Sequence, residues 1–259
     1  YEPQGEALRD DRASVPIRVE SEALDAARAR VKKDRYRLVT IDLPEPTDLA
    51  SSVRESIGAC VSLFTEQPPR GSARNFGFKA YERWMSALRR PSSKDGWGTT
   101  FSPGRPLFAG LTSAFRYALL FWEDGSMTAD RALYADFLDE AAVILDDRSL
   151  TDASSAFRSA GEAWRELGRL LLPDAVPTLA AARAALVERH RSFLATGNRN
   201  VERLRAIDAE LDRLAADADD ALADGELAAR IMSGAADGVE RVRDAERVAV
   251  DALAATVRG

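Results

Sequence analysis

The first group of side chains that could bind a small molecule lies between residues 75 and 101. Aromatic and basic residues alternate there with glycines, and the candidate binding residues are Lys79, Trp84 and Trp97. A tryptophan that follows a glycine in a loop can line a ligand cleft, because its ring is large and carries one polar N–H. The alternative is that Trp97 only holds the loop against neighbouring helices.

Arg131 and Tyr134 form the second group. They lie three residues apart in a segment with helical periodicity, so both side chains project from one face. They either face a cleft or tie two helices together. Asp136, Asp139 and Glu140 lie near Arg131 at helical spacing, and an ion pair with Arg131 explains them adequately.

The sequence assigns no catalytic residue, cofactor or metal. Its single cysteine, Cys60, lies mid-helix among small apolar residues, and its single histidine, His190, lies on a polar helical face. These settings are typical of a buried thiol and a surface imidazole, not of a nucleophile with its base. The sequence contains no glycine-rich phosphate loop, Gly-x-Ser-x-Gly turn or metal-ligand spacing.

Composition excludes further classes of function for this protein. The 259 residues are 46% hydrophobic and carry a net charge of −6, which favours a folded acidic protein and argues against nucleic-acid binding. The longest apolar run, 117–122, is too short to span a bilayer, and no secretory signal opens the chain. We therefore expect a cytoplasmic protein without a membrane partner. Because the first residue is Tyr1, we also expect a piece of a longer protein.

The expected fold is mainly α: a multi-helix bundle with a short N-terminal strand-containing segment and a long C-terminal helical hairpin. Expected domains are a strand-containing remnant or linker (1–46), a helical bundle (47–175) and the hairpin (176–259). Alternating β-formers predict strands at 15–19 and 36–43.

Periodicity predicts three clear helices in the bundle, over 107–122, 128–145 and 151–172. Thr151 is the expected N-cap of the last of them, and its apolar stripe is Phe157, Ala160, Trp164, Leu167 and Leu171. A long loop is expected over 91–106, which is rich in Gly, Pro and Ser. Thr47 is the expected cap of the first helix of the bundle.

In the C-terminal third, Leu204, Ile207, Leu211 and Leu214 step by three and four along a helix. Such a seam is typical of a helical hairpin or short coiled coil, so 178–258 could form a homo-oligomer. A final helix is expected through Ile231, Val239, Val242, Ala249 and Leu253.

Several of these segments together resemble the C-terminal half of the butirosin biosynthesis protein H family. The residues that carry the resemblance are Asp42-Leu43-Pro44-Glu45-Pro46, 53–57, 75–80 with Trp84, Gly96-Trp97, the string 131–141, Ala163-Trp164 and the terminal helix. The match extends over most of residues 10–172, and the string Arg-x-x-Tyr-Ala-x-Phe-Leu is its most specific part.

The resemblance implies an activity and two partners. The founding member transfers an aminoacyl group from a carrier-protein thioester to an amine of an aminoglycoside, using a Cys and a His in an N-terminal cysteine-protease-like domain. Neither of those motifs is present here, so no catalytic residue carries over. By this resemblance, the chain is expected to be the helical part that accompanies the cysteine-protease-like domain and shapes its acceptor cleft. The expected partners are an acyl carrier protein and a small amine.

Two non-enzymatic functions remain open from the residues alone. The chain could be a helical interaction scaffold that assembles through 178–258, or a small-molecule sensor with an apolar pocket in its bundle.

Overall fold

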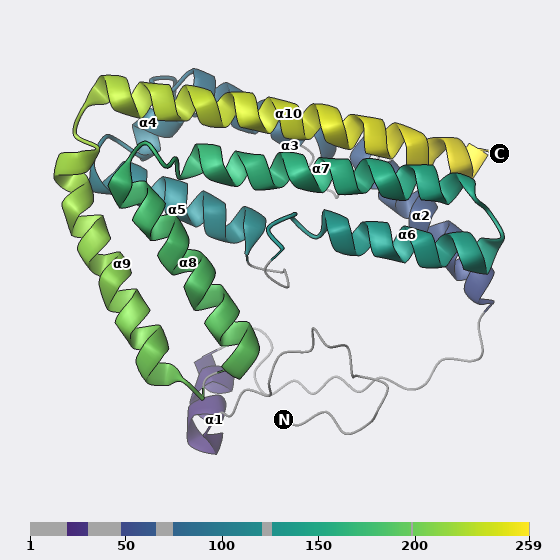
Figure 1. Cartoon of the computed structure of the whole chain (residues 1–259), viewed down its shortest axis with the longest axis horizontal. Coiled ribbons are helices and arrows are strands. Elements are labelled where there is room, and N and C mark those ends of the chain that lie inside the picture. Colours follow the sequence, from purple (N-terminus) through teal and green to yellow (C-terminus); the bar gives the residue numbers. More distant parts are fainter. Residues whose placement is uncertain (1–19, 31–47, 66–74, 121–125, 198, 259) are drawn as a thin grey trace.

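The computed structural model describes residues 20–30, 48–65, 75–120, 126–197 and 199–258, which form ten helices (Figure 1). The helices are α1 (Ser21–Arg30), α2 (Leu49–Thr65), α3 (Gly77–Arg89), α4 (Trp97–Thr100), α5 (Arg105–Leu119), α6 (Arg131–Leu145), α7 (Ser149–Leu171), α8 (Pro177–Thr196), α9 (Val201–Ala221) and α10 (Gly225–Arg258). The mainly helical fold class is thus confirmed. The two expected strands and Thr47 lie outside the described residues.

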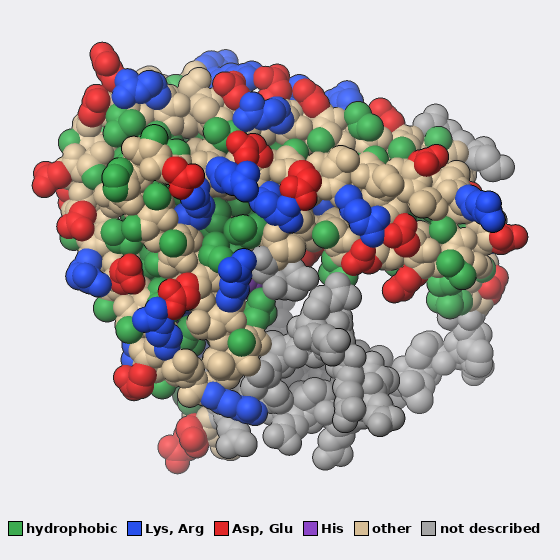
Figure 2. Space-filling model, viewed as in Figure 1, with side chains coloured by type: hydrophobic (Ala, Val, Ile, Leu, Met, Phe, Trp, Pro, Cys, Tyr) green, Lys and Arg blue, Asp and Glu red, His purple; other side chains and the backbone are tan. Residues whose placement is uncertain are grey.

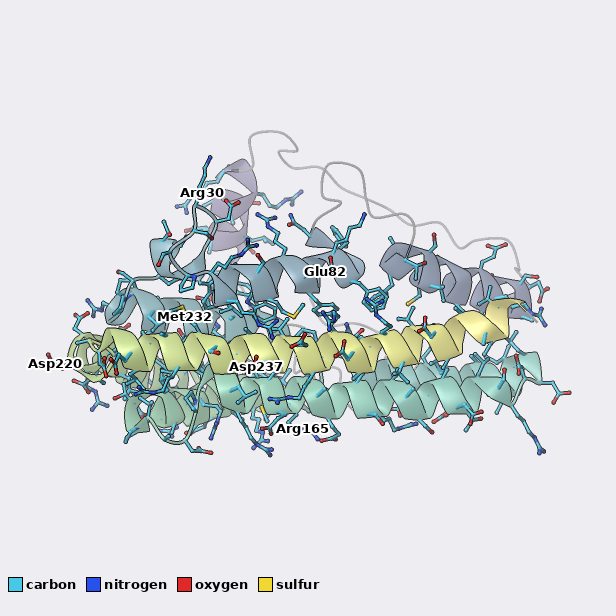
Figure 3. All side chains as sticks on the ribbon, turned by 90° about the horizontal axis from the view of Figure 1, so that it is seen from above. Arg30, Glu82, Arg165, Asp220, Met232 and Asp237 are labelled. Atoms are coloured by element: carbon cyan, nitrogen blue, oxygen red, sulfur yellow. The ribbon has the colours of Figure 1, made fainter. Side chains whose placement is uncertain are left out.

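Helices α7 and α10 form the axis of the bundle and lie side by side along most of their length (Figures 1 and 3). Helix α6 packs on α7, and α3 and α2 pack on α10. The apolar stripe predicted for α7 is confirmed, because all five of its residues are buried. The buried stripe of the final helix is likewise confirmed from Ile231 to Leu253.

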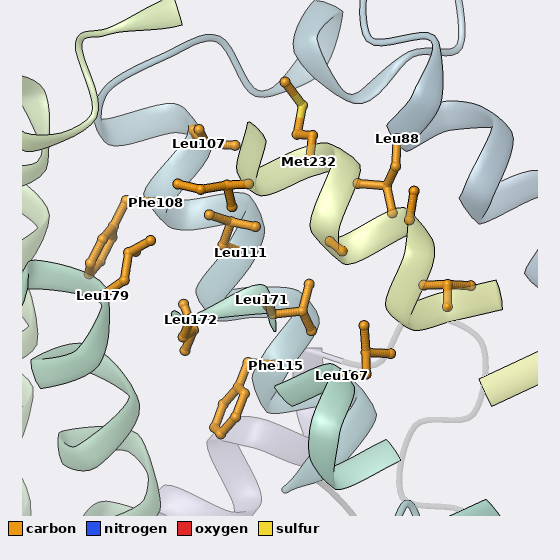
Figure 4. Packing of buried hydrophobic residues seen from close by; sticks show 14 of the residues in the cluster. Leu88, Leu107, Phe108, Leu111, Phe115, Leu167, Leu171, Leu172, Leu179 and Met232 are labelled. Atoms are coloured by element: carbon orange, nitrogen blue, oxygen red, sulfur yellow. The ribbon is translucent and has the colours of Figure 1, made fainter. Parts of the chain in front are cut away.

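Buried apolar residues form two clusters along this axis. The larger one joins α3, α5, α7, α8, α9 and α10, and Figure 4 shows its centre. Its fully buried members include Leu107, Leu111, Phe115, Leu167 and Leu171. The smaller cluster joins α2, α6, α7 and the C-terminal part of α10, around Ile57, Leu138, Phe157 and Leu253.

Helices α8 and α9 form the hairpin, which leans away from the bundle in Figure 1. The apolar seam of α9 packs against other helices of the same chain. Leu204 and Ile207 are buried, and Leu211 and Leu214 pack against the larger apolar cluster. Helix α10 does not stay with the hairpin but returns along α7 and α3. The seam therefore faces other parts of the same chain.

Two local expectations were wrong. Thr151 lies inside α7, which begins at Ser149, and the carboxylate of Asp147 accepts a hydrogen bond from the Ser149 N–H at 2.9 Å. The expected loop 91–106 contains the short helix α4 and the start of α5. Gly96 permits this compact path, since a Cβ there would lie 2.3 Å from the Arg90 carbonyl oxygen.

Candidate functional site

A buried ion pair between Arg131 and Glu246 lies where the two apolar clusters meet. Arg131 is the first residue of α6, and its Nε donates to Glu246 Oε1 on α10 at 2.5 Å. The Glu246 side chain is fully buried. Trp164 of α7 donates its Nε1–H to the same oxygen at 2.8 Å. One carboxylate thus joins three helices.

Aromatic rings enclose this ion pair. The Arg131 guanidinium lies 5.8 Å from the centre of the Trp164 ring, within range of a cation–π contact. Tyr81 of α3 packs against Trp164, with ring centres 6.0 Å apart. Burial, followed by the charge of Glu246, raises the pKa of Tyr81, so its phenol stays protonated.

The charge of Glu246 fixes the charge state of Arg131. Burial alone would lower the pKa of Arg131, but the nearby carboxylate more than offsets this effect and raises it. Arg131 therefore carries its positive charge. The guanidinium also has a local acceptor, since Arg131 Nη1 donates to the Ala129 carbonyl oxygen at 2.6 Å.

The backbone before α6 is strained. Met127, Ala129 and Asp130 all have φ between 52° and 61°, a region that residues with a Cβ rarely adopt. This explains why α6 begins at Arg131 and not at Thr128. Non-glycine residues stay in that region only where surrounding contacts hold them, and strained backbone is common at functional sites.

A second buried polar group lies on α6 one turn further along. Tyr134 packs edge-on against Phe157, with ring centres 4.8 Å apart, and its buried hydroxyl has no hydrogen-bond partner in the described part of the protein. The Cys60 thiol is its neighbour. Burial raises the pKa of both groups, so Cys60 is a protonated thiol and not a ready nucleophile.

The outward edge of Tyr134 contributes to a shallow acidic pocket of about 310 Å³, which we call the α6 pocket. Its lining residues are Asp130, Leu133, Tyr134, Asp136, Phe137 and Glu140. The Tyr134 and Phe137 rings lie side by side at 5.6 Å and form its apolar part. Among the described residues, three carboxylates and no basic side chain line it. Although Asp136 also pairs with Arg158, the lining is negatively charged and favours a cation.

The predicted site residues do not meet in one place. Lys79 is exposed on a separate groove beside Arg83, Arg90 and Lys94. Trp84 and Trp97 contact each other at 6.5 Å between ring centres, and Trp97 also packs edge-on against Phe101.

Arg131 and Tyr134 share one region, but their side chains diverge: Arg131 goes inward to Glu246, and Tyr134 lines the α6 pocket. Asp136 and Asp139 pair with Arg158 of α7, each at 2.8 Å, and not with Arg131 as expected.

Sequence reasoning missed Glu246, although a signal for it existed. The expected stripe of the last helix runs through Val239, Val242, Ala249 and Leu253, and helical spacing puts residue 246 on the same face. A glutamate in an apolar stripe predicts a buried carboxylate that needs a partner.

Residues 130–189 match a family described as a domain of unknown function, DUF4872. The matched segment contains Arg131, Tyr134 and Trp164 but not Glu246. No curated protein and no solved structure matches the chain.

Membrane-spanning helices and metal clusters are both absent from the residues that the structure describes. None of the described helices is both long and apolar enough to cross a membrane. No group of three or more His, Cys, Asp or Glu side chains in the described ranges could hold a metal ion. On the face shown in Figure 2, basic and acidic side chains are interspersed along α7 and α10.

Proposed function

We propose that this chain is the helical companion of a butirosin-H-like acyltransferase of the cytoplasm, and that its α6 pocket receives the amine acceptor. The reaction would be transfer of an aminoacyl group from a carrier-protein thioester to that amine. The nucleophilic Cys and the His would come from outside this chain.

The α6 pocket is the observation that carries the proposal. A protonated amine would be attracted by Asp130, Asp136 and Glu140, and it could approach the faces of Tyr134 and Phe137. All lining residues of the pocket except Asp130 lie within the string 131–141, which is the most specific part of the resemblance, and the matched family segment begins at residue 130.

The buried ion pair supports the pocket from behind. Arg131 and Tyr134 are neighbours on the first turn of α6, and Glu246 holds the Arg131 side chain at the start of that turn. Arg131 and Glu246 are positioning residues in this proposal, whereas the pocket carboxylates would touch the acceptor.

The test is calorimetric titration of the chain with kanamycin, a polyamine acceptor of the implied class, at low ionic strength. We expect binding that weakens about tenfold in the double variant Asp136→Asn/Glu140→Gln, because two charge contacts are lost. The matched control is Asp212→Asn, which removes an exposed carboxylate from α9.

Unchanged affinity in the double variant would contradict an acceptor role for the α6 pocket, as would the absence of kanamycin binding to the wild type. An equal loss in Asp212→Asn would show that only the net charge of the protein matters.

A further inference from the structure

Residues of α2, the α6–α7 turn and the C-terminal turn of α10 line a second cavity. These three elements lie at the same end of the bundle (Figure 1). Its volume is about 340 Å³, at the small end of the range of roughly 300–1,000 Å³ that is typical of ligand pockets. None of the residues considered above for amine binding lines it.

The inner part of this cavity is apolar. Ile57 of α2 and Leu150 of α7 are almost fully buried, and Leu145 closes the α6 side. Val257 of α10 lies at the mouth, where it is 49% exposed. An aliphatic group that entered here would displace water from apolar surface, which is favourable.

Two opposite charges share the rim of the same cavity. Arg54 is exposed on α2, and Asp147 lies in the turn before α7. They are close enough for the guanidinium to help lower the pKa of Asp147, after the hydrogen bonds from Ser149. Nevertheless, no ion pair within 4.0 Å joins them in the described part of the chain.

Both rim groups retain hydrogen-bonding capacity. Asp147 Oδ1 accepts from the Ser149 N–H and from its hydroxyl, at 2.9 and 2.6 Å, which leaves Oδ2 without a partner among the described residues. Arg54 makes no hydrogen bond to the described residues. A guanidinium presents five donors in a planar fork that matches a carboxylate.

We propose that this cavity binds a free α-amino acid with an aliphatic side chain. Its carboxylate would pair with Arg54, its ammonium group with Asp147 Oδ2, and its side chain would lie between Ile57 and Leu150. The separated charges and the apolar interior match the three parts of such a molecule.

Simpler amphiphiles fit the same cavity less well. The carboxylate of a fatty acid could pair with Arg54, but it would also lie near the like charge of Asp147. The ammonium group of an alkyl amine could pair with Asp147, but it would also lie near the like charge of Arg54. A zwitterion satisfies both rim groups at once. The small volume favours a branched aliphatic side chain over a longer one.

The test is calorimetric titration of the whole chain with L-leucine, compared with 4-methylpentanoate and isoamylamine, which each lack one of its charges. We expect leucine to bind with one-to-one stoichiometry and at least about tenfold more tightly than either analogue. Arg54→Gln and Asp147→Asn should each weaken leucine binding by a similar factor.

The variants are chosen to preserve the fold. An asparagine side chain retains an oxygen that can accept from the Ser149 N–H, so Asp147→Asn removes the charge and keeps this hydrogen bond at the start of α7. Val257→Trp fills the mouth and should abolish binding. Arg230→Gln, which changes an exposed arginine near the start of α10, is the control and should bind leucine like the wild type.

Failure of leucine to bind the wild type would overturn the proposal, and so would binding that all three site variants retain. Equal affinity for either analogue would overturn the amino-acid assignment and identify a site for a simple acid or a simple amine. Kanamycin titration of the same variants separates this cavity from the α6 pocket, because they leave every α6-pocket residue intact.

Discussion

Helix α6 is held by two arginine–carboxylate arrangements that have similar bond lengths and very different surroundings. At its first residue, Arg131 pairs with Glu246 of α10, and the carboxylate is fully buried. On its outer face, Asp136 and Asp139 pair with Arg158 of α7, and all three side chains are about half exposed. The two arrangements differ mainly in how much water surrounds the charges.

That difference decides what each arrangement contributes. Water already solvates the charges of an exposed pair, so its formation gains little free energy and salt screens it. Burial removes solvation from both ions, and the loss of either partner leaves the other uncompensated. The inner pair therefore specifies how α6, α7 and α10 meet, whereas the outer pair adds little to the bundle.

The largest effect is expected for Glu246→Ala. This change leaves the mostly buried Arg131 without its carboxylate and Trp164 Nε1 without its acceptor. We expect the free energy of unfolding to fall by about 3–5 kcal/mol, measured by urea denaturation. A loss below about 1 kcal/mol would mean that water reaches the pair and that the inner and outer arrangements are equivalent.

A smaller loss is expected when both charges are removed together. Arg131→Met/Glu246→Leu leaves no unpaired ion, so the remaining cost is chiefly the Trp164 N–H without an acceptor, about 1–3 kcal/mol. The measurement is a double-mutant cycle with the two single variants. If the two single losses simply added in the double variant, the residues would not act as a pair.

The contrast between these pairs also shows which features of the fold could be predicted from the sequence. Apolar periodicity predicted the buried stripes of α7 and α10, because a stripe depends only on residues within one helix. Start positions were predicted less well: backbone with positive φ delays α6 to Arg131, and α7 begins at Ser149, two residues before the expected cap Thr151.

The candidate site could be predicted only in part. Arg131 and Tyr134 were recognised from their spacing, but their partners depend on tertiary packing. Arg131 was expected to pair with nearby Asp136, whereas its partner lies 115 residues away on α10. Helical spacing identifies which residues can meet on one helix and not which helix lies opposite. Trp84 and Trp97 do contact each other, but Lys79 lies on a different surface.

A slight effect is expected from Arg158→Ala, which removes the basic partner of both outer carboxylates. We expect the melting temperature to fall by no more than about 2 °C, since exposed pairs contribute little. The difference from the wild type should disappear in about 1 M NaCl, where charges are screened within about 3 Å. A large, salt-resistant loss in this variant would remove the contrast with Glu246→Ala.

The subtlest effect concerns pH. Hydrogen bonds from Arg158, then from Ser154, hold the pKa of Asp139 below its ordinary value in the folded protein. A carboxyl with a lowered folded pKa stabilises the fold above its unfolded pKa of about 3.9, and this contribution is lost as the pH falls through the lower folded value. The small difference in stability between wild type and Arg158→Ala should therefore be constant near neutral pH and shrink below about pH 4.

An NMR titration of the Asp139 carboxyl measures the cause directly, because the pKa of this carboxyl should rise towards the ordinary range in Arg158→Ala. An unchanged pKa would show that Arg158 does not pair with Asp139 in solution, and Asp136 would then be the only carboxylate of the outer arrangement left to link α6 to Arg158.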